Sequence, residues 1–201
     1  MLGFSIPSCQ WTLTKIPESC FEESKISGEL VIPSSCESME RFAFSNCHSL
    51  ESVVFESGSR LRTIDNYAFD GCTSLKSIII PASVSSIESE CFYLCASLTD
   101  LSFEVESELR WIGSCAFMNC GLLHRIYMQN CSKLTSIGDR ALYGNDEIYF
   151  LQMGATTPPR LGNNVFGYVG AYSVLKVPAG SESAYRAASG WNAFSSITAI
   201  D

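Results

Sequence analysis

The chain has 201 residues, 46% of them hydrophobic, and a formal net charge of -8 with an isoelectric point near 4.8. The hydrophobic content is enough for a continuous core, whereas the acidic balance argues against nucleic acid as a partner, because phosphates require a basic surface. It also argues against electrostatic docking on anionic membranes, and the absence of any apolar run near the roughly 20 residues that span a bilayer argues against membrane insertion.

Residues 1–12 precede the repetitive part of the chain and are assigned to an N-terminal edge segment. Its apolar residues Phe4, Ile6 and Trp11 are candidates to cover the open edge of the structure that follows, and a frayed terminus is the alternative. The first residues lack a basic region and their apolar run is too short for a signal peptide. Either the protein is cytosolic or a targeting segment has been removed.

A unit of 23–25 residues then repeats across residues 13–178. Each copy has an apolar anchor, a small residue before it, and apolar residues at six, nine and eleven positions after it, with a few departures. A fixed period in the twenties is typical of a leucine-rich solenoid rather than of a single globular core. The anchors are Phe21, Phe44, Phe69, Phe92, Phe117, Leu142 and Phe166.

The pair at positions nine and eleven alternates with a period of two, which predicts a short strand with one buried face. One such strand cannot bury its apolar face alone, so stacked copies are expected to form a parallel ladder with the anchors in one internal row behind it. The pairs are Leu30/Ile32, Val53/Phe55, Ile78/Ile80, Leu101/Phe103, Ile126/Met128, Leu151/Met153 and Leu175/Val177.

The third copy carries the pattern A-F-x-x-C-x-x-L-x-x-I-x-I-P-x-S-V-x-x-I, which includes Leu75, Ile78 and Ile80. This pattern resembles the BspA-like leucine-rich repeat family of bacterial and protist surface proteins, over roughly residues 13–178. The expected fold is a curved right-handed leucine-rich repeat solenoid, α/β to mainly β. It has a parallel strand ladder on one face, about seven repeats and a helical cap at the C-terminus. The resemblance also implies an extracellular or cell-surface location, with the signal sequence removed, and adhesion to host proteins or other cells.

The ten cysteines do not follow the spacing of a small disulfide framework. Four of them lie three residues after an anchor and form one column, and Cys20 and Cys91 take the small-residue position before an anchor. We expect buried free thiols, because parallel side chains hold Cβ atoms farther apart than the ~3.8 Å that a bridge prefers. Stacked disulfides are the alternative, which thiol titration decides. The column consists of Cys47, Cys72, Cys95 and Cys120.

Residues 179–201 have a different pattern and are assigned to a C-terminal cap that continues the same domain. Ser181 suits a helix N-cap and Gly190 suits a helix end, which predicts a short helix over residues 182–189. Apolar residues after it are expected to pack onto the last repeat and to add a final strand. These residues are Trp191, Phe194, Ile197 and Ile200.

The sequence shows no constellation that predicts catalysis. A nucleophile needs a base such as His beside it, yet His48 and His124 occupy positions where other copies carry unrelated side chains, as surface positions do. The cysteine pairs that approach zinc spacing already have core roles, so we expect no metal and no cofactor. A hydrolase built on residues 162–164 and Tyr168 is a remaining alternative, but no general base accompanies them.

The outward-facing strand residues are the remaining candidates for function. They contain an aliphatic group and a group of one arginine and two aromatic residues, and the second group has the residue types that dominate interface hot spots. The alternative interpretation is that branched and aromatic residues occur here only because they are favoured in strands. We call them the aliphatic patch (Val31, Val54 and Ile79) and the aromatic patch (Arg125, Tyr127 and Phe150).

The sequence therefore predicts a non-enzymatic module that binds a protein or a glycan through this strand face, most simply as a monomer. The alternative is a structural spacer or stalk whose strand face binds nothing.

Overall fold

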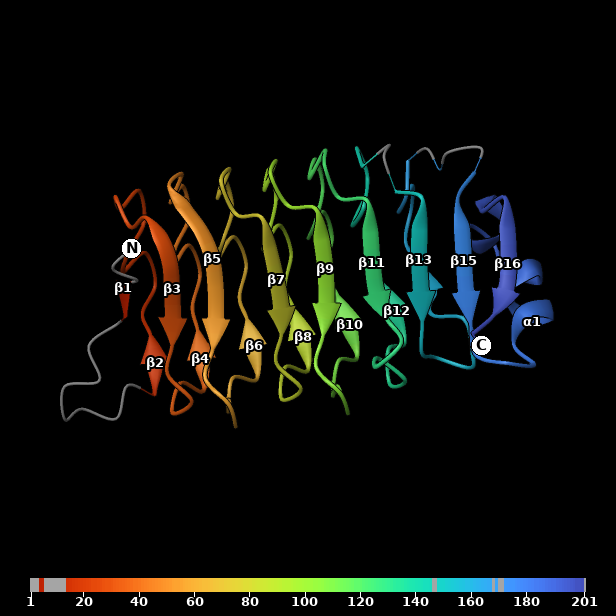
Figure 1. Cartoon of the computed structure of the whole chain (residues 1–201), viewed down its shortest axis with the longest axis horizontal. Helices are drawn as coiled ribbons and strands as arrows, with labels where there is room; N and C mark the ends of the chain where they lie inside the picture. Colours follow the sequence, from red (N-terminus) through yellow and green to blue (C-terminus); the bar gives the residue numbers. More distant parts are fainter. Residues whose placement is uncertain (1–3, 6–13, 146–147, 168, 170–171, 201) are drawn as a thin grey trace.

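The computed structural model describes residues 4–5, 14–145, 148–167, 169 and 172–200. Successive turns of the chain lie side by side along one long axis (Figure 1). This arrangement confirms the predicted leucine-rich repeat solenoid with its parallel ladder of strands.

Among the described residues, the main ladder contains nine parallel strands, and each strand pairs with the equivalent strand of the next turn. In the seven strands from β3 to β15, the inward residues are the predicted apolar pairs, which are buried except for the half-buried Phe55. The strands are β1 (Phe4–Ser5), β3 (Gly28–Ile32), β5 (Leu50–Phe55), β7 (Ser77–Ile80), β9 (Asp100–Phe103), β11 (Arg125–Met128), β13 (Phe150–Met153), β15 (Val174–Val177) and β16 (Ser196–Ala199).

A second parallel ladder, with seven strands in the described part of the chain, runs along the return side of the solenoid and was not expected from the sequence. Each strand has two residues, of which the second is apolar and points into the core, as Ile64 does. The strands are β2 (Lys15–Ile16), β4 (Ser38–Met39), β6 (Thr63–Ile64), β8 (Ser86–Ile87), β10 (Trp111–Ile112), β12 (Ser136–Ile137) and β14 (Arg160–Leu161).

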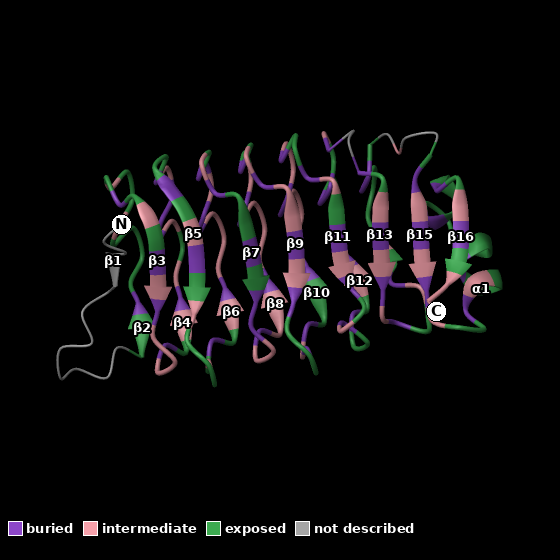
Figure 2. Ribbon diagram, in the orientation of Figure 1, coloured by how far each residue is buried: buried purple, intermediate pink, exposed green. Residues whose placement is uncertain are grey.

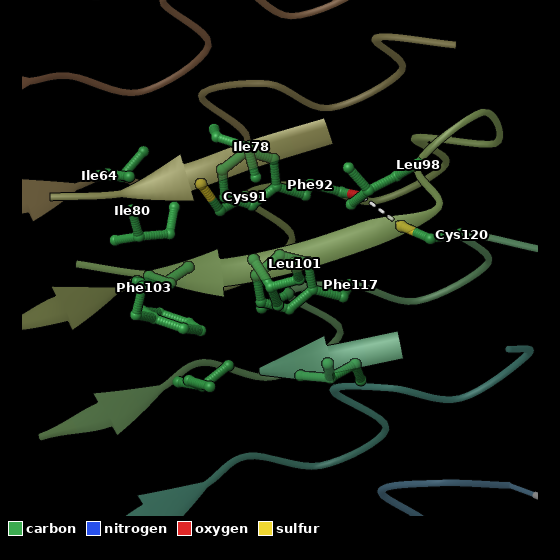
Figure 3. Packing of buried hydrophobic residues seen from close by; sticks show 14 of the residues in the cluster. Ile64, Ile78, Ile80, Cys91, Phe92, Leu98, Leu101, Phe103, Phe117 and Cys120 are labelled. Carbon is green, nitrogen blue, oxygen red and sulfur yellow. Dashed lines mark hydrogen bonds between the residues drawn. The ribbon is translucent and has the colours of Figure 1, made fainter. Parts of the chain in front are cut away.

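The anchor phenylalanines form the single internal row that the repeat predicts. Phe92 lies between the rings of Phe69 and Phe117, with centroids 5.2 Å and 5.0 Å away and planes within 8° of parallel. Figure 3 shows Phe92 and Phe117 behind the strands that carry Ile78 and Leu101. Each turn therefore packs against the apolar surface of the next, which is how a repeat too small for its own core becomes stable.

Besides the two strand ladders, main-chain hydrogen bonds connect neighbouring turns through the anchor loops, which are the loops that carry the anchor residues. We call these bonds the loop ladder: the N–H of an anchor, and that of the residue two before it, donate to carbonyls of the next turn. Phe117 N–H donates to Ala141 at 2.8 Å, and Cys115 N–H donates to Asp139 at 2.8 Å. Cys115 has a φ of 55°, so the loop places a residue in the left-handed region to aim this donor.

The column cysteines also bond between turns. Cys120 Sγ donates to the carbonyl of Phe92, the anchor of the preceding turn, at 3.2 Å (Figure 3). Asn145 takes the column position in the sixth turn, and its Nδ2 donates to the Phe117 carbonyl at 2.7 Å. The nine cysteines of the described residues are free thiols. The prediction that Cys20 is buried is wrong, because this residue is exposed in the first full turn.

The C-terminal cap contains helix α1 (Glu182–Ala187) and the 3₁₀-helix η1 (Trp191–Ala193). Helix α1 ends two residues before the predicted boundary, because Ala188 is extended with ψ near 130°. Ser181 occupies the N-cap position, although its side chain makes no capping bond. Trp191 and Phe194 are buried as predicted and pack edge-on against Phe166.

The predicted final strand is β16, which pairs in parallel with β15 and buries Ile197. At the other end, β1 pairs with β3 through Phe4 and Ser5. Ile6 and Trp11 lie outside the described residues. Within the described part of the chain, no helix has both the length and the hydrophobicity that crossing a bilayer requires.

Candidate binding surface

The outward residues of the main ladder form a nearly continuous face, because side chains alternate between the core and solvent along each strand. Figure 2 shows this alternation as buried bands between half-buried and exposed ones. Neighbouring strands align equivalent residues, so Ser102 pairs with Ile79 on one side and with Tyr127 on the other. The aliphatic and aromatic patches therefore lie on the same face, separated at the closest by one small residue.

The aromatic patch is formed by β11 and β13. Arg125 aligns with Phe150 in the ladder, and Tyr127 lies two residues further along β11 on the same face. The rings of Tyr127 and Phe150 are 5.5 Å apart and tilted by 47°. Both rings are half-buried and Arg125 is exposed, so the patch presents ring surface whose orientation is fixed by packing.

Arg125 is also fixed in place by its neighbour on β9. Its Nε donates to Asp100 Oδ1 at 2.8 Å, and this carboxylate raises the pKa of the guanidinium further above its ordinary value. The second oxygen of Asp100 accepts from Thr99 Oγ1 at 2.9 Å. The carboxylate is therefore held from both sides, and none of the described residues forms a hydrogen bond with the terminal nitrogens of Arg125.

Two further aromatic residues flank the aromatic patch and were missed in the sequence. His124 and Tyr149 precede β11 and β13, and their ring centroids are 6.1 Å apart. Tyr149 is 48% exposed. The sequence predicts a surface position for His124 but did not single out Tyr149. A signal was present, because these two aromatic residues occupy one column directly beside Arg125 and Phe150.

Two side chains of the aliphatic patch are well exposed to solvent although they are apolar. Val54 is 42% exposed and Ile79 is 58% exposed. A cavity of about 130 Å³ opens beside them, lined also by Val53, Phe55 and Glu104. The prediction that both residues of the β5 pair are buried is therefore wrong for Phe55, which is only half-buried and lines this cavity.

The described residues contain no group of three or more His, Cys, Asp or Glu side chains placed to hold a metal ion. The Nδ1 of His48 is engaged with the Gly71 carbonyl at 2.9 Å, and Asn163 is bound to the carboxylate of Asp139. Tyr168, named in the hydrolase alternative, lies outside the described residues.

Comparison with known proteins supports the repeat assignment. A family model described as "BspA type Leucine rich repeat region" matches residues 55–171 in six copies. Comparison with curated proteins finds no significant match.

Two solved structures share the fold. A leucine-rich cell surface protein from Faecalibacterium prausnitzii A2-165 is 25% identical with a TM-score of 0.64, covering 82% of this chain and 42% of its own. A leucine-rich repeat protein from T. pallidum is 25% identical with a TM-score of 0.51, covering 79% of this chain and 81% of its own. The chain thus spans less than half the length of the Faecalibacterium protein.

Proposed function

Since the chain belongs to the BspA-type leucine-rich repeat family, we propose that it is a non-enzymatic binding module of an exported or surface-displayed protein. Its ligand is a protein or a glycan, and its role is adhesion to host proteins or to other cells. The cell-surface description of the Faecalibacterium relative supports the location.

The observation that carries this proposal is the aromatic patch. Tyr127 and Phe150 present rings in a fixed mutual orientation, so little side-chain entropy is lost when a ligand covers them. Arg125 adds a guanidinium that Asp100 holds in place at 2.8 Å. Tyrosine and arginine are the residue types most enriched in interface hot spots, and pre-organisation is what converts contact area into affinity.

The shape of the face favours an extended ligand over a small molecule. Ile79 and Tyr127 are separated by two strand spacings, about 10 Å, so one ligand reaches both patches. The cavity beside Val54 is about 130 Å³, well below the roughly 300–1,000 Å³ of small-molecule pockets. Aromatic rings at the surface suit either a protein side chain or the apolar face of a sugar.

The test compares two variants in binding to a panel of extracellular matrix proteins and immobilised glycans. The first replaces Arg125, Tyr127 and Phe150 by Ala. The control replaces Arg110 and Trp111, an exposed Arg and aromatic pair on the return ladder, by Ala. We expect the first variant to lose binding to any ligand of the panel and the control to keep it.

Both variants should remain folded, and the thermal midpoint of the first should fall only modestly, because its two rings are half-buried and the exposed ion pair contributes about 0–1 kcal/mol. Binding that survives the first variant, or is lost in the control, contradicts the proposal. A face that binds nothing in the panel favours the spacer alternative.

A further inference from the structure

The loop ladder has an open end at the seventh turn. In turns one to six, the N–H of the anchor and that of the residue two before it each donate to a carbonyl of the next turn. In the sixth turn, for example, Leu142 N–H donates to the Val165 carbonyl at 2.8 Å. The equivalent donors in the seventh turn are the N–H groups of Asn164 and Phe166.

The C-terminal cap lies next to this open end without pairing with it. Trp191 packs edge-on against Phe166, and its Nε1 donates to the Pro159 carbonyl at 2.8 Å. Within the part of the chain that is described, no carbonyl accepts from the N–H of Asn164 or Phe166. The cap therefore replaces the packing of an eighth turn but not its loop ladder.

A cleft of about 380 Å³ occupies the position where that part of an eighth turn would lie. Its volume falls within the usual range of ligand sites, about 300–1,000 Å³. One wall is the anchor loop with both donors, and the other wall is the cap. The cap residues that line it are Ser189, Gly190 and Ala193.

The chemistry of the lining selects a neutral ligand. None of the described residues that line the cleft is charged. The carboxylate of Asp139, which lies nearby, is occupied by the N–H of Asn163 at 2.7 Å. An anion would find no positive charge there, and a cation would find no free carboxylate among the lining residues.

The spacing of the donors selects a peptide backbone. In the earlier turns, two N–H groups two residues apart bond to two carbonyls that are also two residues apart: Phe42 and Phe44 donate to Asn66 and Ala68 at 3.2 Å and 2.8 Å. The acceptor segment is a turn rather than a strand, because Tyr67, the residue between the two carbonyls, has a φ of 60°. A peptide that adopts the same turn presents its two carbonyls to the open donors in the same way.

We propose that this cleft binds an uncharged peptide segment of a partner protein in the turn conformation of the anchor loops, whose alternate carbonyls accept the N–H groups of Asn164 and Phe166. The segment continues the loop ladder by one turn. This site is separate from the strand face and does not depend on the binding function proposed for it.

The probe is a blocked, uncharged hexapeptide with the sequence of residues 162–167, Gly-Asn-Asn-Val-Phe-Gly, because this segment supplies the acceptors for the sixth turn. Titration into the ¹⁵N-labelled protein should shift the amide resonances of Asn164 and Phe166 in a saturable way. The A193W variant, which fills the cleft from an exposed position, should weaken binding at least tenfold. The A187W variant, on the exposed surface of α1, should not.

The strand-face triple Ala variant should bind the hexapeptide as the parent does, so failure here and failure of the proposed function are distinguishable. Amide shifts that are absent at millimolar peptide, or that survive in A193W while its thermal midpoint matches that of A187W, overturn the proposal. So do equal shifts with inorganic phosphate, which indicate an anion site. Shifts that grow with protein concentration alone indicate a second copy of the chain and also overturn it.

Discussion

Replacing Phe92 by Ala tests how strongly each turn depends on its neighbours. The ring is fully buried and stacks on Phe69 and Phe117 at 5.2 Å and 5.0 Å. Loss of the buried ring costs about 2–3 kcal/mol in transfer free energy, and the cavity that remains raises the total to about 3–5 kcal/mol. We therefore expect F92A to lower the free energy of unfolding by about 4 kcal/mol.

The matched control is F21A, at the start of the same row. Phe21 is half-buried and has one stacking neighbour in the row, Phe44 at 5.1 Å. With about half the burial and one ring contact, its removal should cost roughly 2 kcal/mol. Urea unfolding followed by circular dichroism measures both. A cost of F92A below about 1.5 kcal/mol, or a cost of F21A equal to it, refutes the model of a row in which each ring is stabilised by its two neighbours.

Two further predictions concern ionisation and thiol reactivity. Burial, and then the charge of Glu90, raise the pKa of Asp70 to about 6, so the folded state binds its proton more tightly than the unfolded state does. This stabilising contribution is complete below about pH 4 and is lost as pH rises through 6, so D70N should raise the free energy of unfolding by about 1 kcal/mol at pH 8 after discounting for solvent screening. Urea midpoints from pH 4 to 8 measure this, and a gain of equal size at pH 4 contradicts it. In brief alkylation followed by mass spectrometry, Cys20 should react at least a hundredfold faster than Cys95, whose pKa is raised by burial. Equal rates would show that the column is open to solvent.

The anchors and strand pairs were predictable because each copy of the repeat shows which residue type occupies the same structural position. Val53 and Ile78, for example, occupy equivalent positions, and both are buried. One residue per strand pointing inward is enough to set the register of a parallel ladder.

The second ladder was not predictable in the same way. Its strands have two residues, such as Thr63–Ile64, and two residues are too short for any alternation to be recognised. The exposure of Phe55 and Cys20 was also missed. Both depend on the three-dimensional surroundings, a cavity edge for Phe55 and the end of the stack for Cys20, rather than on position within the repeat.

The sequence identified the residue types of the aromatic patch, whereas the distances and contacts between its side chains come from the structure. The bond from Arg125 to Asp100 joins residues 25 positions apart, one repeat apart in the sequence. Register alone placed these two side chains in neighbouring strands, but not within hydrogen-bond distance. The contact between His124 and Tyr149 likewise follows from the same register, once both are treated as surface residues of one column.

The most direct test of the strand face as the binding surface is hydroxyl-radical footprinting of the protein with and without a ligand from the binding panel. Our proposal predicts that oxidation of Tyr127 and Phe150 falls at least threefold on binding, while oxidation of Trp111 on the return ladder stays unchanged. Protection of Trp111 with no change at Tyr127 and Phe150 would contradict it.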